Sequence, residues 1–230
     1  MSVAVLVITD GRDDYLAESV RSALGSLTGP IVEWWMFDDT GRDDYRQGLA
    51  RRYPTFRHIN AGPRQGFGGA IRGAWAHLAE QSTARYVFHL EGDFTFCRPV
   101  DLGPLTTLLD TRPHLAQVAL VRQPWNDAER AAGGLLAAHP GAFTPHADRH
   151  GHQWLEHRLW WTTNPSMYRR SLLAVGWPDG PQSEGLFTHR LLEDGTPETE
   201  PAHLAFGYWG QATDPPWVDH IGHRRAGRDY

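Results

Sequence analysis

Four segments in the first ninety residues have the apolar, β-branched or aromatic composition of short β-strands. The first, VAVLVIT, is apolar at every position before its final threonine, as expected of a strand that is covered on both faces. Polar blocks separate the strands, and within them apolar residues recur at the three- and four-residue spacing of helices. The predicted strands are residues 3–9, 31–37, 56–60 and 84–90. The predicted helices are residues 13–24, 43–53 and 71–81.

This alternation predicts an α/β fold with a mostly parallel central sheet flanked by helices, because right-handed crossovers join neighbouring parallel strands. A glycine-rich loop, AGPRQGFGGA, is predicted over residues 61–70 and leads into the third helix. In such sheets, ligands bind beyond the carboxyl ends of the strands. Polar residues occupy three of these ends, namely Thr9-Asp10, Asp38-Asp39 and Glu91-Gly92-Asp93. The pattern therefore predicts a ligand site at that edge of the sheet.

The second half of the chain is less regular. Residues 124–160 are rich in His, Ala, Pro and Gly, and they predict loops around a short helix. A polar tail begins at Trp217, and neither an internal repeat nor a long linker divides the chain, so we predict one domain. The other predicted elements are strands over 115–123 and 203–211, a strand, turn and short helix over 158–178 with the turn at Asn164-Pro165, and a helix over 183–195.

Composition narrows the class of protein. The 230 residues carry a net charge of −5, so no overall basic field attracts nucleic acid. The single cysteine, Cys97, excludes an internal disulfide and fits a reducing compartment. The opening MSVAVLVITD has no basic leader, and its apolar run is far too short to span a bilayer. We expect a cytoplasmic protein without an integral membrane segment, and the sequence leaves its oligomeric state open.

The two acids around Gly92 carry the clearest chemical signal. Two acids separated by one residue at a strand end can project toward the same side of the sheet. They repel each other there unless a positive charge lies between them. Mg²⁺ or Mn²⁺ suits hard oxygen ligands and typically shares a few carboxylates with substrate phosphates. Glu91 and Asp93 are therefore candidates to bind a divalent cation together with a phosphorylated ligand, although a solvated turn is the more common explanation of an isolated pair of this kind.

Several motifs together, in their order along the chain, resemble a known family. VLVITDGR, MFDDTG, RQGFGGAIRGAW and FHLEGDFTF are followed by NPSMYRRSLLAVGWP and SEGLFTHRLLEDG. This layout resembles the GT-A fold glycosyltransferases, a Rossmann-like nucleotide-diphospho-sugar transferase fold, and in particular the inverting glycosyltransferase family 2. The resemblance covers nearly the whole chain and is weakest over residues 124–157. It implies a nucleotide-sugar-binding half over 1–97 and an acceptor-side half over 98–230.

The resemblance also implies roles for individual residues. Thr9 and Asp39, with Asp38, would contact the nucleoside of a UDP-, GDP- or dTDP-sugar, and Glu91 would approach its ribose or sugar. Glu184 would be the general base that deprotonates an acceptor hydroxyl for a single inverting displacement. The implied donor-binding set is Thr9, Asp10, Asp38, Asp39, Gly66, Arg72, Glu91, Gly92 and Asp93.

A metal site is implied as well. Asp93 would hold Mn²⁺ or Mg²⁺ against the diphosphate, and either His220 or His223, from the late segment DHIGHRR, would add a ligand. Arg224 and Arg225 would clamp the diphosphate. A surface tail with incidental histidines and solvated arginines is the alternative reading of this segment.

Two other functions remain open from the sequence. One is a non-catalytic protein of the same fold that binds a nucleotide or carbohydrate, and the other is a nucleotidyltransferase. Nucleotidyltransferases usually carry a phosphate-binding loop with glycine and lysine after the first strand. The corresponding segment here, TDGRDDY, contains no lysine. The acceptor of a transferase stays undetermined among a glycan, a protein, a small molecule and a modified nucleobase. Nucleic acid is therefore expected as a partner only if one of its bases is the sugar acceptor.

Overall fold

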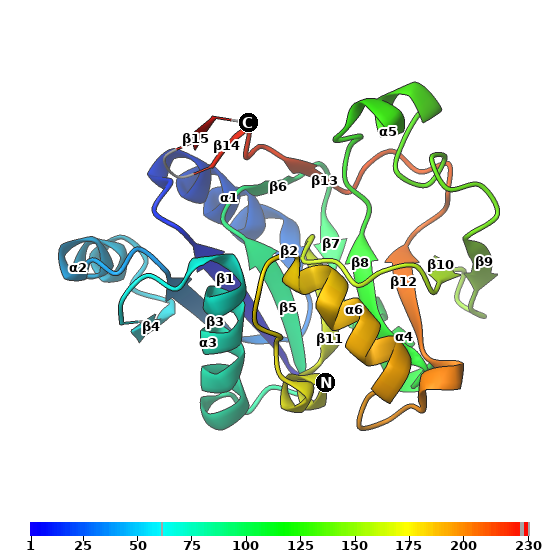
Figure 1. Cartoon of the computed structure of the whole chain (residues 1–230), viewed down its shortest axis with the longest axis horizontal. Helices are drawn as coiled ribbons and strands as arrows, with labels where there is room; N and C mark the ends of the chain where they lie inside the picture. The colour runs from blue at the N-terminus through cyan, green and yellow to red at the C-terminus, as the bar shows by residue number, and fades with distance from the viewer. Residues whose placement is uncertain (61, 226–227, 230) are drawn as a thin grey trace.

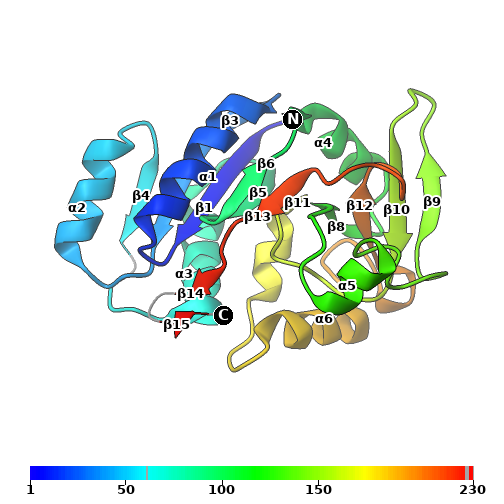
Figure 2. The ribbon, with the colours of Figure 1, turned by 90° about the horizontal axis from the view of Figure 1, so that it is seen from above.

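A nine-stranded sheet forms the centre of the molecule, and helices cover both of its faces (Figures 1 and 2). The computed structural model of the chain describes residues 1–60, 62–225 and 228–229. The strands of the sheet, in spatial order, are β4 (Arg57–Asn60), β3 (Ile31–Asp38), β1 (Val3–Thr9), β5 (Tyr86–Glu91), β11 (Ser166–Arg169), β8 (Leu115–Leu120), β12 (Ala205–Trp209), β10 (Gln153–His157) and β9 (Thr144–Ala147).

The first four strands are parallel to one another, as the sequence predicts. Strand β1 lies between β3 and β5, with Thr9 opposite Asp38 and Ile8 opposite Glu91. Strand β11 then runs antiparallel to both β5 and β8, whereas β8 and β12 are parallel. The carboxyl ends of β1, β3, β5, β8 and β12 consequently meet at one edge of the sheet. The predicted mixed α/β fold with a mostly parallel sheet is confirmed.

Alternating side chains of each strand build two separate cores. In β1, Val3, Val5 and Val7 pack on one face, and Ala4 and Leu6 pack on the other. The first core is covered by α1 (Asp13–Ser26), α2 (Asp43–Arg52) and α4 (Leu102–Thr111). The second is covered by α3 (Gly66–Gln81), the 3-10 segment η1 (Arg170–Val175) and α6 (Ser183–Asp194). Burial on both faces explains the continuous apolar runs of the inner strands.

Helix α3 begins earlier than the sequence predicts. Its first residue is Gly66, so the last part of the expected glycine-rich loop is helical. The carboxylate of Asp39 accepts hydrogen bonds from the backbone N–H groups of Gln65 and Gly66, at 2.7 and 2.8 Å. These N–H groups lack partners within a helix, and a carboxylate from a distant strand therefore replaces a local cap. The sequence around residue 66 contains no sign of this contact.

The second half contains elements that the sequence does not reveal. The expected short helix within residues 124–160 is α5 (Asp127–Ala132), but the same region also forms β9 and β10. Helix α4 was not predicted, although its buried leucines have helical spacing. Part of the expected polar tail forms β13 (Val218–His220), which pairs antiparallel with β6 (Phe94–Phe96). The remaining described elements are two pairs of two-residue strands and a short 3-10 segment: β2 (Leu27–Thr28) with β7 (Val100–Asp101), β14 (Arg224–Arg225) with β15 (Arg228–Asp229), and η2 (Pro201–His203).

Candidate active site

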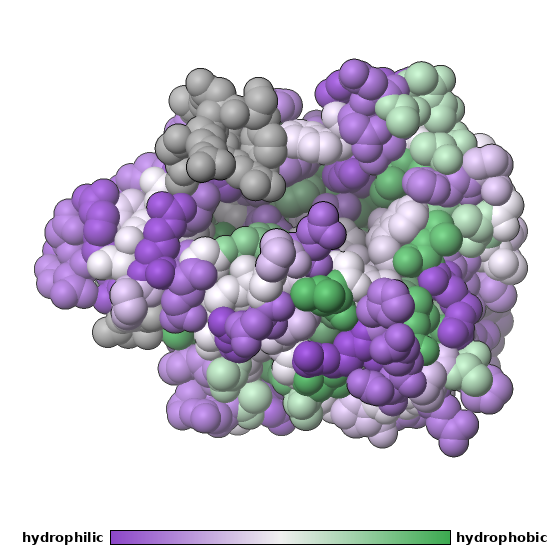
Figure 3. All heavy atoms as spheres, viewed as in Figure 1, coloured by the Kyte–Doolittle hydropathy of each residue, from purple (hydrophilic) through white to green (hydrophobic). Residues whose placement is uncertain are grey.

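A cleft of about 1240 Å³ opens at the carboxyl edge of the sheet. Figure 3 shows the molecule hollowed at the upper centre of this face. Strand ends of β1 and β5, the start of α3, the start of α6 and the segment around Trp125 all contribute to its lining. The predicted residues that line it are Thr9, Asp10, Asp39, Gly66, Arg72, Glu91, Gly92, Asp93, Glu184 and His220.

Asp38 and His223 are not part of this lining. The Asp38 carboxylate accepts hydrogen bonds from the backbone N–H and the hydroxyl of Thr40, both at 2.9 Å, and it closes the turn after β3. It is 2% exposed and turned away from the cleft. His223 is exposed and stacks on Trp125, with ring centroids 5.5 Å apart. Arg224 and Arg225, the predicted diphosphate clamp, have side chains outside the described part of the structure.

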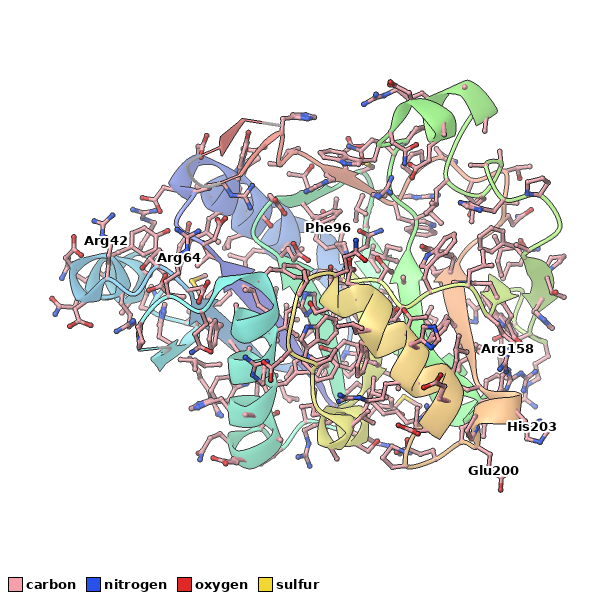
Figure 4. All side chains as sticks on the ribbon, in the orientation of Figure 1. Arg42, Arg64, Phe96, Arg158, Glu200 and His203 are labelled. Carbon is pink, nitrogen blue, oxygen red and sulfur yellow. The ribbon has the colours of Figure 1, made fainter. Side chains whose placement is uncertain are left out.

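Asp39 forms the floor of the cleft beside the start of α3. Burial raises the pKa of its carboxyl group, although two backbone N–H groups and Arg64 favour the charged form. Arg64 is exposed on the loop that precedes α3, where Figure 4 labels it, and it lines the same part of the cleft. Arg72 lies nearly two turns into α3 and forms an ion pair with Asp179. This end of the cleft thus combines a fixed acceptor with two guanidinium groups.

Gly92 holds the two acids of the β5 end close to β1. Its N–H donates to the Ile8 carbonyl at 2.8 Å, and a Cβ atom at this position would lie 3.1 Å from the same oxygen. A larger residue would require these atoms to shift by a few tenths of an ångström, so the tight contact favours glycine between the acids. Burial, and then the neighbouring Asp93 charge, raise the pKa of Glu91 well above its usual value. Glu91 and Asp93 therefore have opposite protonation tendencies.

Asp93 contacts two basic side chains from distant parts of the chain. Its Oδ2 atom accepts a hydrogen bond from the Arg12 guanidinium at 2.9 Å and lies 3.2 Å from Nε2 of His220. Burial alone would raise the pKa of Asp93, but His220 and Arg12 outweigh it and hold the pKa below its ordinary value. The Oδ1 atom is buried and has no hydrogen-bond partner in the described structure. An ionised carboxylate with one unused oxygen thus faces the cleft.

His220 is held rigidly in front of Asp93. Its backbone N–H and C=O are both bonded to the Gln123 side chain, each at 2.8 Å. Its ring stacks on Phe94, with centroids 4.6 Å apart and planes 15° apart, and lies 4.1 Å from the Trp125 ring. Because β13 pairs with β6, the late histidine is brought to the acids of β5 across 127 residues of sequence.

Glu184 lies in the first turn of α6, on the opposite wall of the cleft. Its Oε1 atom accepts hydrogen bonds from both the backbone N–H and the hydroxyl of Thr163, at 2.7 and 2.8 Å. Thr163 precedes β11, the antiparallel strand next to β5, and so fixes the carboxylate relative to Glu91. A carboxylate positioned in this way can accept a proton from a hydroxyl group in the cleft.

The far part of the cleft is aromatic. Trp160 donates its indole N–H to the Tyr208 hydroxyl at 3.1 Å, and the ring of His139 meets Trp160 edge-on at 4.8 Å. Arg122, which lines the same wall, is bound by both oxygens of Glu129, at 2.6 and 3.0 Å. The cation is neutralised there, and the remaining surface suits a ring-shaped or apolar-faced molecule.

The residues present fit a divalent cation that shares its coordination with a ligand. Two ligands about 2.1 Å from an octahedral cation lie about 3 Å apart, and Asp93 Oδ2 and His220 Nε2 are 3.2 Å apart. The described residues include no group of three or more His, Cys, Asp or Glu side chains that could hold a metal on their own. A cation here would need further oxygens from water or a diphosphate, as is usual for Mg²⁺.

Sequence reasoning missed three contributors to this site. Arg12 contacts Asp93 from 81 positions away, Thr163 orients Glu184, and Trp125 packs on His220. The motif TDGR contains Arg12, but only the fold brings it to the β5 acids. No signal in the sequence distinguishes Trp125 from the nine other tryptophans.

Solved structures of glycosyltransferases share this fold. The chain is similar to residues 1–349 of S. aureus TarS, with a TM-score of 0.61 and 16% identity over 96% of this chain and 60% of that one. For the same TarS fragment in complex with UDP-GlcNAc, the TM-score is 0.59 and the identity 15%, over 98% and 62%. For the mannosyltransferase PcManGT from Pyrobaculum calidifontis in complex with GDP-Man and Mn²⁺, the TM-score is 0.57 and the identity is 16%. The match covers 89% of this chain and 56% of that one.

The chain spans about three fifths of the length of these proteins. No protein-family model matches it, and no curated protein does. The search for a helix long and apolar enough to cross a membrane found none among the described residues. The expected resemblance to glycosyltransferases of GT-A-like fold is thereby confirmed at the level of the fold.

Proposed function

We propose that this protein is a metal-assisted, inverting glycosyltransferase that moves a sugar from a nucleoside-diphosphate donor to an acceptor hydroxyl. The observation that carries the proposal is the convergence of Asp39, the Glu91–Asp93 pair and Glu184 on one cleft. These acids come from three distant segments, and a fold shared with glycosyltransferases brings them together. The solved neighbours bind UDP-GlcNAc or GDP-Man with Mn²⁺, which supports a nucleotide sugar as donor.

The donor would occupy the end of the cleft between β1 and α3. Asp39 keeps lone pairs on both oxygens after its bonds to the start of α3, and it can accept an N–H from a nucleobase. Thr9 and Asp10 line the same end, and Arg64 and Arg72 supply positive charge. Residues 1–97 would thus form the donor half, and 98–230 the acceptor half.

Asp93 and His220 would hold the divalent cation, whose bound charge would stabilise the departing diphosphate. The unused Oδ1 atom of Asp93 gives this carboxylate capacity for a further contact. Burial raises the pKa of Glu91, and in its protonated form this residue can donate a hydrogen bond to a ribose or sugar oxygen. Protonation of Glu91 also avoids a repulsion that two ionised acids would create at the β5 end.

Glu184 would act as the general base. Its Oε1 atom is engaged by Thr163, so the carboxylate can accept the acceptor's proton while keeping its orientation. The acceptor oxygen then forms the new bond to the anomeric carbon as the bond to the diphosphate oxygen breaks. One displacement of this kind inverts the anomeric configuration. The aromatic wall of Trp160 and Tyr208 is the surface on which the acceptor would lie.

A mass-spectrometric screen of UDP-, GDP- and dTDP-sugars tests this proposal. We expect hydrolysis of one donor to nucleoside diphosphate and free sugar in the presence of Mn²⁺, and loss of that activity in Asp93→Asn. Conversion of a donor and added pyrophosphate to nucleoside triphosphate and sugar 1-phosphate would instead identify a nucleotidyltransferase. Nucleotide binding without turnover of any donor or acceptor would identify a non-catalytic protein. Gly48→Ala, in the exposed helix α2 with free space around residue 48, is the control for purification and folding.

A further inference from the structure

Arg12 occupies the space around Asp93 that a metal ion would also need. Its Nη2 atom lies 2.9 Å from Asp93 Oδ2, and its Nε atom lies 2.8 Å from Asp10 Oδ1. The guanidinium thus joins the end of β1 to the end of β5. The Arg12 side chain is only 21% exposed, and it lines the cleft.

The surroundings place this arginine beside Asp93. Gly11 has a φ of +97°, and this turn delivers residue 12 to the start of α1. The Arg12 guanidinium lies 5.4 Å from the centre of the Tyr15 ring, which is within cation–π range. On the other side of Asp93, the backbone of Gly222 approaches Oδ2 so closely that a Cβ atom would lie 2.1 Å from it. Asp93 therefore cannot turn away from Arg12 without moving this backbone.

Resting on the proposed function, we propose that Arg12 is a resident counter-cation that competes with the divalent metal for Asp93. In the nucleotide-free protein the guanidinium neutralises Asp93 and keeps the metal out. The donor diphosphate offers Arg12 a second anionic partner of suitable geometry, because guanidinium groups bind phosphate oxygens through two parallel hydrogen bonds. Asp93 is released when Arg12 turns to the diphosphate, and the metal then binds together with the nucleotide.

This exchange makes metal and nucleotide binding strongly coupled. Free Mn²⁺ binds weakly, and each ligand raises the affinity for the other by the same factor, as thermodynamic linkage requires. Arg64 lines the same cleft, but the structure records no contact between it and Asp93. A loss of positive charge at Arg64 therefore changes the general field of the cleft without freeing the Asp93 carboxylate.

Electron paramagnetic resonance of Mn²⁺ measures this competition directly, without any turnover. We expect Arg12→Met to tighten Mn²⁺ binding to the nucleotide-free protein about tenfold or more, because a like charge next to the metal site is removed. Addition of UDP or GDP should raise the Mn²⁺ affinity of the wild type strongly and that of Arg12→Met much less. Arg12→Gln, which can still donate a hydrogen bond to Asp93, serves if the methionine variant folds poorly.

Three controls make the outcome decisive. Arg64→Met should leave Mn²⁺ affinity without nucleotide near the wild-type value, and Arg12→Lys should stay close to the wild type because the charge is kept. When Asp93→Asn is added to Arg12→Met, the increase in Mn²⁺ affinity should be lost. Unchanged or weaker Mn²⁺ binding in both neutral Arg12 variants would overturn the proposal. The donor-hydrolysis screen on the wild type is independent of this result, so the two proposals fail separately.

Discussion

Replacing Gly222 by alanine is expected to disturb the Asp93 site from the backbone side. An alanine Cβ would lie 2.1 Å from Asp93 Oδ2 and 2.7 Å from its Cγ. To reach 3.0 Å, the shortest separation that real Cβ atoms show, the two groups must move apart by about 0.9 Å. Arg12 and His220 hold the carboxylate from the other side, and the N–H of Ile221 holds the Asp93 carbonyl at 2.8 Å.

The cost follows from these contacts. Overpacking in a close-packed region costs about 1–3 kcal/mol, and a weakened hydrogen bond to a charged group costs a similar amount. We therefore expect Gly222→Ala to lower the free energy of unfolding by about 2 kcal/mol, which lowers the Tm of a chain this long by about 4–8 °C. The nucleotide-dependent binding of Mn²⁺ should weaken in the same variant, because the Asp93–His220 pair loses its spacing.

Thermal melts with and without Mn²⁺ and nucleotide measure both effects. Gly48→Ala, where an added Cβ meets nothing within 4 Å, should leave the Tm unchanged or raised. In an Asp93→Ala background the clashing carboxylate is gone, so Gly222→Ala should cost much less there. An equal loss of stability in both backgrounds would refute the reasoning, since it would place the cost of Gly222→Ala elsewhere than at Asp93.

Two further predictions concern catalysis and pH. Glu184→Gln should lower the transfer rate about 10²- to 10⁴-fold and leave donor affinity unchanged, because the amide oxygen still accepts a hydrogen bond from Thr163 but cannot act as a base. Steady-state kinetics measure the rate and nucleotide titration measures the affinity. An unaltered rate would exclude Glu184 as the base. Burial lowers the pKa of His89 to about 4 from 6.5, so the stability that neutral His89 provides is complete above pH 6.5 and is lost as the pH falls toward 4. The resulting decrease in the free energy of unfolding approaches roughly 3 kcal/mol. His89→Phe should flatten the stability–pH profile over that range in urea titrations, and an unchanged slope would contradict the assignment.

The donor half of the fold was predictable because its signals are local. Strands such as β1 are buried on both faces and need continuous apolar sequence, and their ends carry the acids at positions that the pattern locates. The start of α3 was not predictable, since the group that caps it is Asp39, from a strand 26 residues earlier. Local propensity places glycine-rich sequence in a loop, and a tertiary contact made it helical.

The acceptor half of the fold was harder to predict from the sequence, because its strands lack a clear local pattern. Strand β9 is an edge strand of the sheet and β10 is its neighbour, and TPHA and QWLEH show neither continuous apolar character nor regular alternation. Asp38 and Asp39 look equivalent in sequence, yet only Asp39 lines the cleft, while the Asp38 carboxylate accepts a hydrogen bond from Thr40. Side-chain direction after a strand end is set by the following turn, which the pattern of apolar residues does not determine.

Asp93 links segments from the beginning, middle and end of the chain, and this has a consequence for how the site works. Arg12 reaches it from 81 residues away, and His220 from 127 residues away. The Arg12 guanidinium is a positive charge of the protein itself, and it balances part of the negative charge of the cleft. On the proposed function, a diphosphate and a metal would exchange with an internal partner rather than fill an unbalanced site. Binding affinity is then a difference between two sets of charge-assisted bonds, and a substitution at Arg12 alters the free protein as much as the complex.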